Sequence, residues 1–191
     1  MTIKADFERV EVTGPEALWA WLEAHHGQGE SVWLITWKAA HRAKYVSRED
    51  VLDALIAYGW IDGRRMKVDD DRTMQLISPR KEQAWAQSYK TRAERLETEG
   101  RMQAPGRAAI AVSKRSGKWM ASAKIDALVE PEDLLTALEA RGAREFWDKS
   151  APSYRRNILR FIAGAKRPET RAKRIATTTE YAARGEKVPQ Y

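Results

Sequence analysis

Residues 59–80, GWIDGRRMKVDDDRTMQLISPR, decide the fold of the first part of the chain. Two runs rich in apolar and β-forming residues, 60–68 and 72–77, flank the triplet Asp69-Asp70-Asp71. Because aspartate favours turns, this order predicts an antiparallel hairpin, although no glycine specifies the turn type. Gly59 precedes the hairpin and is well placed to end a helix in the left-handed conformation.

The residues before this stretch predict two helices and a buried strand. Residues 31–39, SVWLITWKA, are apolar on both faces, which predicts an inner strand that is covered on both sides. Residues 6–12 alternate weakly and predict a short strand or an extended arm. A helix is expected to open at Pro15, and a second one follows Ser47, whose S-x-x-D pattern is a capping signal.

The residues after the hairpin predict helices alone. Ser78-Pro79 is expected to cap and open a helix that runs to about residue 98. Further helices are expected over 105–116, 131–140, 152–163 and 168–184, each opened by a proline. The sequence therefore predicts an α+β fold: a small antiparallel sheet with helices in residues 1–80 and a helical part in residues 81–191. The helix at the junction predicts that both parts pack as one unit.

Composition limits the class of protein. The 191 residues are 43% hydrophobic and 32% charged, and they contain no cysteine, which excludes disulfides and thiolate chemistry. No apolar run has the length of a membrane helix, so we expect no membrane association. The first 14 residues lack the apolar core of a secretory signal, so a cytoplasmic protein is expected. The sequence does not indicate an oligomeric state.

The net charge of +7 is unevenly distributed. Residues 1–100 carry 15 basic and 17 acidic side chains, whereas residues 101–191 carry 19 and 10. The candidate basic surface consists of Arg155, Arg156, Arg160, Lys166, Arg167, Arg171 and Arg174. Such a cluster indicates either contact with nucleic acid or a solvated helical face. No aromatic platforms accompany it, which favours the solvated face.

No catalytic or metal-binding signature is present. The chain lacks H-E-x-x-H, a P-loop, G-x-G-x-x-G and G-x-S-x-G. The histidines His25, His26 and His41 do not have the spacing of a metal site. The aspartate triplet lacks the distant glutamate of a calcium loop. We therefore expect no metal and no cofactor, and the sequence assigns no catalytic residue.

Asp62 is the acidic residue of greatest interest, because Arg64 and Arg65 follow it closely. In a regular strand, Asp62 and Arg64 share one face and Arg65 lies on the other. On a functional interpretation, the carboxylate orients an arginine toward an anionic ligand. On a structural interpretation, Asp62 caps the turn after Gly59 and the arginines lie in solvent. Both interpretations remain open.

Arg80 and Trp85 fall within the first two turns of the helix expected after Pro79. Helix N-termini attract anions through their free N–H groups, and Arg80 and Lys81 would add positive charge there. Capping and surface charge are the structural alternative, and tryptophans are more often core anchors than binding platforms. The candidate site for a small anionic ligand consists of Trp60, Asp62, Arg64, Arg80 and Trp85.

Several motifs resemble those of the YdeI/OmpD-associated family, which is also labelled bacteriocin-protection. They are GWIDG at 59–63, SPR at 78–80, AW at 84–85, AERLETEGRM at 93–102 with Gly106, and AKRPETRAKRI at 165–175. The matching positions are Trp60, Asp62, Gly63, Arg80, Trp85, Arg95, Gly100, Arg101, Met102, Lys166, Thr170, Arg171 and Arg174.

The resemblance implies a link to resistance against antimicrobial peptides or bacteriocins and to an outer-membrane porin, with no agreed catalytic residues. Because the matching positions are rich in arginine, tryptophan and glycine and poor in nucleophiles, they favour binding over hydrolysis. We expect a binding or stress-protection protein with an anion-accepting pocket. The alternatives are a nucleic-acid-associated protein and an enzyme that uses Asp62 as acid or base.

Overall fold

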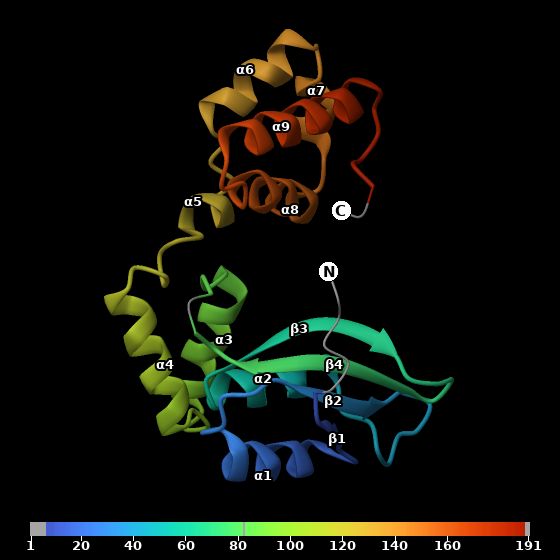
Figure 1. The fold of residues 1–191 in the computed structure, drawn as a ribbon, viewed down its shortest axis with the longest axis vertical. Coiled ribbons are helices and arrows are strands. Elements are labelled where there is room, and N and C mark those ends of the chain that lie inside the picture. Colours follow the sequence, from blue (N-terminus) through green and yellow to red (C-terminus); the bar gives the residue numbers. More distant parts are fainter. Residues whose placement is uncertain (1–6, 82, 190–191) are drawn as a thin grey trace. The chain divides into compact units, whose positions relative to one another are not determined.

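The computed structural model describes residues 7–81 and 83–189. The chain forms two compact units, Met1–Ala121 and Ser122–Tyr191 (Figure 1). The first unit contains a sheet and helices and the second contains helices, which confirms the predicted α+β class with a helical C-terminal half. The predicted boundary near residue 80 stays a prediction, and the helices that directly follow the sheet belong to the first unit.

The sheet of the first unit has the strand order β1-β2-β4-β3. Its strands are β1 (Arg9–Glu11), β2 (Val32–Trp37), β3 (Trp60–Lys67) and β4 (Arg72–Pro79). The hairpin β3–β4 and the pair β2–β4 are antiparallel, as predicted, whereas β1 joins β2 in parallel. β2 is an inner strand, which confirms the interpretation of its two apolar faces. At the hairpin turn, the Asp69 carboxylate accepts hydrogen bonds from the backbone N–H groups of Asp71 and Arg72.

The helices of the first unit pack with the sheet around one core. They are α1 (Pro15–His25), α2 (Arg48–Ala57), α3 (Gln87–Thr98) and α4 (Ala104–Arg115). Ser47 and Asp50 form the predicted capping box at the start of α2. Every residue of α2 from Val51 to Ala57 is buried, because the helix contacts α1, α3, α4 and β3. The central element of this unit is therefore α2.

The predicted helix start at Ser78-Pro79 is wrong. Both residues belong to β4, where Ser78 pairs with Ile61 and Pro79 with Trp60. The ladder between β2 and β4 ends at Ile77, so Pro79 lies where β4 has only β3 beside it. A proline has no backbone N–H group to donate to a neighbouring strand, so it is tolerated where a strand has a neighbour on one side only. Consequently α3 begins only at residue 87, and neither Arg80 nor Trp85 lies on a helix.

The second unit is a small helical bundle. Its helices are α5 (Ala123–Asp126), α6 (Glu132–Ala140), α7 (Arg144–Lys149), α8 (Pro152–Ala163) and α9 (Pro168–Ala183). Its core is formed by Leu134, Leu138, Trp147, Ile158, Leu159 and Ile162, among others. The predicted proline-opened helices are confirmed here, with Pro131 as the N-cap of α6 and prolines in the first turns of α8 and α9.

Two glycines let α4 approach the C-terminal end of α2. Gly59 has φ of +72°, which confirms its predicted left-handed conformation. Gly106 lies in the first turn of α4, and a Cβ atom there would stand 2.3 Å from the carbonyl oxygen of Ala57 and 2.7 Å from that of Ile56. Backbone oxygens of a buried helix cannot move aside cheaply, so the contact between these helices requires glycine at 106.

Gly106→Ala should therefore destabilise the protein, although alanine is the better helix former. We expect a loss of about 1–3 kcal/mol in the free energy of unfolding from overpacking, against a gain of at most about 1 kcal/mol in helix propensity. Urea unfolding followed by circular dichroism measures the difference. Gly27→Ala is the control, because a Cβ atom there meets nothing within 4 Å. Equal stability of Gly106→Ala and Gly27→Ala would contradict the close approach of α4 to α2.

Candidate anion-binding site

A register shift in β3 rearranges the side chains around Asp62. The pairing of β3 with β4 is irregular between Asp62 and Arg65. Past this irregularity Arg65 donates a hydrogen bond of 2.9 Å to Gln75 Oε1, and Gln75 Nε2 donates one of 3.1 Å to Asp62 Oδ2. Arg64 instead stacks on Trp33, 5.2 Å from the ring centroid. The predicted pairing of Asp62 with Arg64 on one face is therefore wrong, because a bulge breaks the alternation.

Asp62 is held by two neutral donors. Besides Gln75, the hydroxyl of Tyr89 on α3 donates a hydrogen bond to Asp62 Oδ1. Burial and the adjacent Asp62 carboxylate raise the pKa of Tyr89 to about 12, so its hydroxyl stays protonated and keeps donating at neutral pH. Neither Tyr89 nor Gln75 was a sequence candidate. Tyr89 lies nine residues after Arg80, and the sequence offers no signal that joins it to Asp62.

Arg80 lies directly after β4, and its backbone N–H donates to the carbonyl oxygen of Gly59 at 2.9 Å. Its guanidinium group stacks on Trp85, 4.0 Å from the ring centroid, and lies 5.4 Å from that of Tyr89. Nη1 donates to the carbonyl oxygen of Gln83 at 3.4 Å, a long bond. Nε and Nη2 are buried and have no hydrogen-bond partner among residues 7–81 and 83–189. Burial lowers the pKa of Arg80 to about 10, so the group remains charged at neutral pH.

The two candidate tryptophans are core residues. Trp60 is 1% exposed and donates from Nε1 to the carbonyl oxygen of His26 at 3.2 Å. Trp85 is fully buried, and its Nε1 donates to Ser113 Oγ at 2.7 Å. Trp85 still contributes one ring face to Arg80, whereas no cation–π contact joins Arg80 to Trp60 within the described residues. The structure thus gathers Asp62, Arg80 and Trp85 around Tyr89 and leaves Trp60 and Arg64 outside this group.

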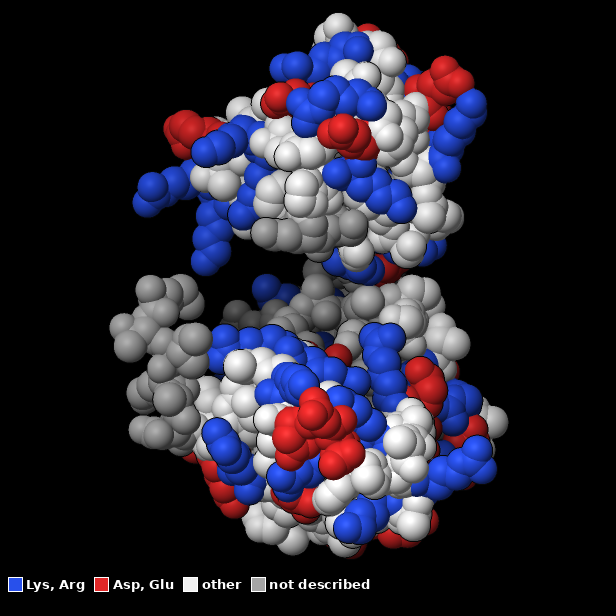
Figure 2. All heavy atoms as spheres, turned by 90° about the vertical axis from the view of Figure 1, so that its right-hand side faces the viewer, with Lys and Arg blue, Asp and Glu red and all other residues white. Residues whose placement is uncertain are grey.

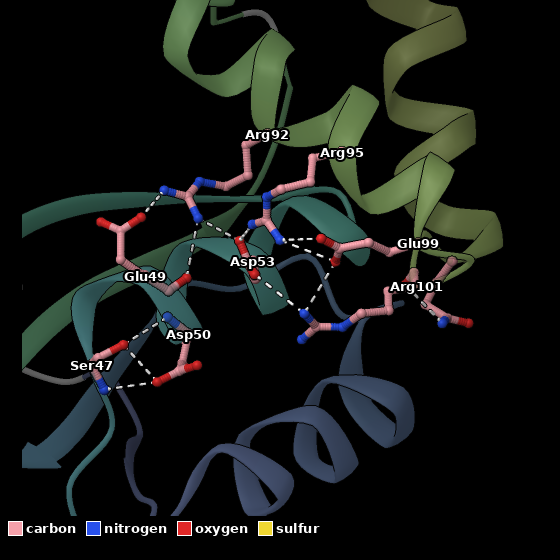
Figure 3. Close-up of polar contacts among 9 residues, drawn as sticks. Ser47, Glu49, Asp50, Asp53, Arg92, Arg95, Glu99 and Arg101 are labelled. Carbon is pink, nitrogen blue, oxygen red and sulfur yellow. Dashed lines mark hydrogen bonds and ion pairs between the residues drawn. The ribbon is translucent and has the colours of Figure 1, made fainter.

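A second polar cluster joins α2 to α3 and the following loop (Figure 3). Asp53 on α2 is 6% exposed. Its carboxylate forms ion pairs with Arg92, Arg95 at 2.5 Å and Arg101 at 3.5 Å. Glu49 and Glu99 take further bonds from the same guanidinium groups, so three arginines face three carboxylates. We call these six residues the Asp53 cluster.

The Asp53 cluster is balanced in charge. It includes three positions of the motif AERLETEGRM, Arg95, Glu99 and Arg101, and gives them a structural role. Burial alone would raise the pKa of Asp53, but hydrogen bonds from Arg95 and Arg92 and their positive charges outweigh it and hold the pKa below the ordinary 3.8. A pocket of about 430 Å³ opens beside the cluster, but its arginines already have carboxylate partners. Asp53 was missed in the sequence, although an aspartate inside the apolar run VLDALIA was a usable signal.

Most of the predicted basic surface is engaged within the second unit. Arg155 pairs with the nearly buried Glu130, Arg160 with Asp126, and Arg171 with Asp133. Arg156 donates to the carbonyl oxygen of Asp126, and Arg174 donates to that of Phe161. Lys166 and Arg167 are exposed and form no ion pair within the described residues. Lys and Arg still outnumber Asp and Glu on the face of this unit drawn in Figure 2.

Residues 7–81 and 83–189 contain neither a metal-binding cluster nor a membrane-spanning helix. No group of three or more His, Asp or Glu side chains there could hold a metal ion. No helix within the same residues combines the length and the apolar character needed to cross a bilayer.

The fold and the sites describe a two-unit α+β protein in which arginines, and not nucleophiles, dominate the polar clusters. Residues 10–109 match the model of a domain of unknown function, DUF8412, and since this is over half of the chain, the protein belongs to that family. Residues 127–185 match the family model described as Bacteriocin-protection, YdeI or OmpD-Associated. This match confirms the resemblance predicted from the sequence and lies within the second unit. No curated protein and no solved structure matches the chain.

The Asp53 cluster makes a prediction for stability and its pH dependence. Asp53→Asn removes the central charge and leaves three guanidinium groups under-neutralised, so the free energy of unfolding at pH 7 should fall by about 3 kcal/mol. Because the pKa of Asp53 is lowered in the folded state, its contribution is present above pH 3.8 and is lost as the pH falls through the folded-state pKa. Urea unfolding should show a smaller difference in stability between the wild type and Asp53→Asn at pH 3 than at pH 7.

Asp70→Asn is the matched control, since the Asp70 side chain at the hairpin tip is 93% exposed. It should change stability by no more than about 0.5 kcal/mol. A similar loss in both variants at pH 7 would show that the Asp53 cluster does not hold the helices together.

Proposed function

We propose that the protein is a binding protein that uses Arg80 to hold a small oxyanion, a carboxylate or a phosphate. The observation that supports this most directly is the Nε–Nη2 edge of Arg80, which has no hydrogen-bond partner within the described part of the chain. Nε–H and one N–H of Nη2 point in the same direction and form the fork that binds two oxygen atoms of one anion. Nη1, which makes the long bond to Gln83, lies outside this edge. The part of the guanidinium suited to an oxyanion is thus the part that has no hydrogen-bond partner among residues 7–81 and 83–189.

The surroundings of Arg80 keep its charge available. Stacking on Trp85 fixes the plane of the guanidinium group. The negative charge of Asp62 acts on Arg80, but Asp62 is bonded to Tyr89 and Gln75 and forms no ion pair with Arg80. Buried donors without acceptors are costly, so an anion that supplies two acceptors gains from restoring those bonds. Because Nε and Nη2 are out of contact with solvent, a covering side chain must move aside when the anion enters.

The same contacts weigh against the alternative functions. A nucleic-acid surface needs free cations, and five of the seven predicted basic residues already have acidic or carbonyl partners within the second unit. An acid or base at Asp62 would compete with its two hydrogen bonds. The cytoplasmic location and the role in antimicrobial resistance, expected from the sequence and the resemblance, remain predictions.

Thermal denaturation of the full chain with added phosphate or acetate, against chloride at equal ionic strength, tests the proposal. An anion that binds the folded state raises the melting temperature, and a hundredfold excess over its dissociation constant adds about 2.7 kcal/mol. The two anions distinguish a phosphate site from a carboxylate site. Arg80→Lys keeps the positive charge but loses the fork, so we expect it to lose the gain. Arg64→Lys is the matched control and should retain it, since Arg64 stacks on Trp33 instead.

Two results would contradict the proposal. The first is a wild-type protein that neither anion stabilises beyond chloride, and the second is an undiminished gain in Arg80→Lys. Arg80→Met measures the packing role separately. If stacking on Trp85 is the whole role of Arg80, Arg80→Met keeps the stability of the wild type in chloride. Phosphate and acetate then change the melting temperatures of the two proteins equally.

A further inference from the structure

A groove lies between α3 and α4 in the first unit. It has a volume of about 320 Å³, which falls within the range of pockets for small molecules. Its lining consists of Ala93, Glu94, Glu97, Arg107, Ile110, Ala111, Lys114 and Trp119. None of these side chains belongs to the Arg80 site or to the Asp53 cluster. The groove is therefore a separate feature of this unit.

The two ends of the groove differ in their chemistry. Arg107 and Lys114 are seven residues apart on α4, which is about two helical turns or roughly 10 Å along one face. At one end Arg107 pairs with Glu97 at 2.9 Å, so that end is neutral. At the other end Lys114 lies over the ring of Trp119, with Nζ 5.2 Å from the ring centroid. The small or apolar side chains of Ala93, Ile110 and Ala111 line the groove between them.

A second lysine stands at the Trp119 end. Lys90 is 5% exposed, and its Nζ lies 5.6 Å from the centroid of the Trp119 ring. Neither Lys90 nor Lys114 forms an ion pair with any residue in 7–81 or 83–189. Most of the Lys90 side chain is buried, whereas its Nζ is not among the buried atoms that lack a hydrogen-bond partner. Two ammonium groups beside one aromatic ring thus form a cationic end that has no ion-pair partner among the described residues.

The position of Trp119 is fixed from behind. Its ring packs against Trp85, with 5.1 Å between the centroids, and its backbone N–H donates to the carbonyl oxygen of Ser113 at 3.0 Å. Trp85 is itself anchored by its hydrogen bond to the side chain of Ser113. The aromatic wall is therefore part of the packed unit and does not need a ligand to form.

We propose that this groove binds a small monocarboxylate with a compact apolar body. The apolar body lies on Ala93, Ile110, Ala111 and the Trp119 ring, and the carboxylate meets the ammonium groups of Lys90 and Lys114. Among the charged side chains of the lining, Glu97 and Arg107 neutralise each other and Glu94 stands against Lys114. Lys90 lies outside the lining but beside the Trp119 ring, and it adds the positive charge that favours an anion. A carboxylate beside the two lysines takes charge-assisted hydrogen bonds from them in place of water.

Titration calorimetry of the full chain with 2-naphthoate tests this site. Naphthalene-2-methanol has the same apolar body without the charge, and acetate has the charge without the body. We expect 2-naphthoate to bind more tightly than either. Lys114→Gln should weaken its binding about tenfold, since it removes one charged hydrogen bond. Glu94→Gln should strengthen it, since it removes a nearby negative charge.

Arg115→Gln is the matched control for Lys114→Gln. Arg115 is the adjacent exposed cation of α4 but does not line the groove, so 2-naphthoate should bind this variant as it binds the wild type. Lys114 is also exposed, and circular dichroism should show all three variants folded. Lys114→Gln should keep any phosphate-dependent gain in melting temperature, which separates a failure at this groove from a failure at Arg80.

Three results would overturn the proposal. Equal affinity for naphthalene-2-methanol would show that the lysines do not contribute. Equal affinity of Lys114→Gln and Arg115→Gln would place the ligand elsewhere. Weaker binding of 2-naphthoate to Glu94→Gln would show that Glu94 favours the ligand. The groove would then suit a zwitterion, whose ammonium group pairs with Glu94, better than a monocarboxylate.

Discussion

The first unit depends on one buried carboxylate. Asp53 lies on α2, which contacts α1, α3, α4 and β3, and it is bonded to arginines from α3 and from the loop after it. A buried charge is tolerated only when its partners are held in place. Here Glu49 and Glu99 hold the same guanidinium groups from their outer side. The cluster therefore fixes where α3 can lie, and with it the position of Tyr89 and of the groove wall.

The C-terminal end of α2 sets the position of Arg80. Gly59 ends the helix with a positive φ. Its carbonyl oxygen accepts a hydrogen bond from the backbone N–H of Arg80, which directly follows β4. Gly106 lets α4 contact the same helix end, and α4 carries Ser113, which anchors Trp85 beneath the Arg80 guanidinium. Backbone conformation and close packing thus bring together groups that are far apart in sequence.

The sequence predicted the elements better than the contacts between them. Local signals sufficed for the hairpin, the capping box at Ser47 and the proline-opened helices, because caps and turns depend on neighbouring residues. The strand at Ser78-Pro79 was missed because pairing with Trp60 and Ile61 overrides a local helix signal. The bulge after Asp62 was missed. One extra residue in a strand moves each following side chain to the opposite face of the sheet. Tyr89 and Lys90 owe their roles to tertiary packing, for which a single sequence gives no signal.

The arginines of the first unit show how one residue type serves two purposes. Arg92 and Arg95 have carboxylate partners on more than one side, and their contribution is to hold helices together. Arg80 has an aromatic partner for its face and none for its Nε–Nη2 edge within the described residues. The motifs SPR at 78–80 and AERLETEGRM at 93–102 contain arginines of both kinds, so a motif match alone does not separate them. The state of pairing does: a satisfied guanidinium is explained by the fold, whereas the Nε–Nη2 edge of Arg80, which has no partner among the described residues, is the edge that we propose for an anion.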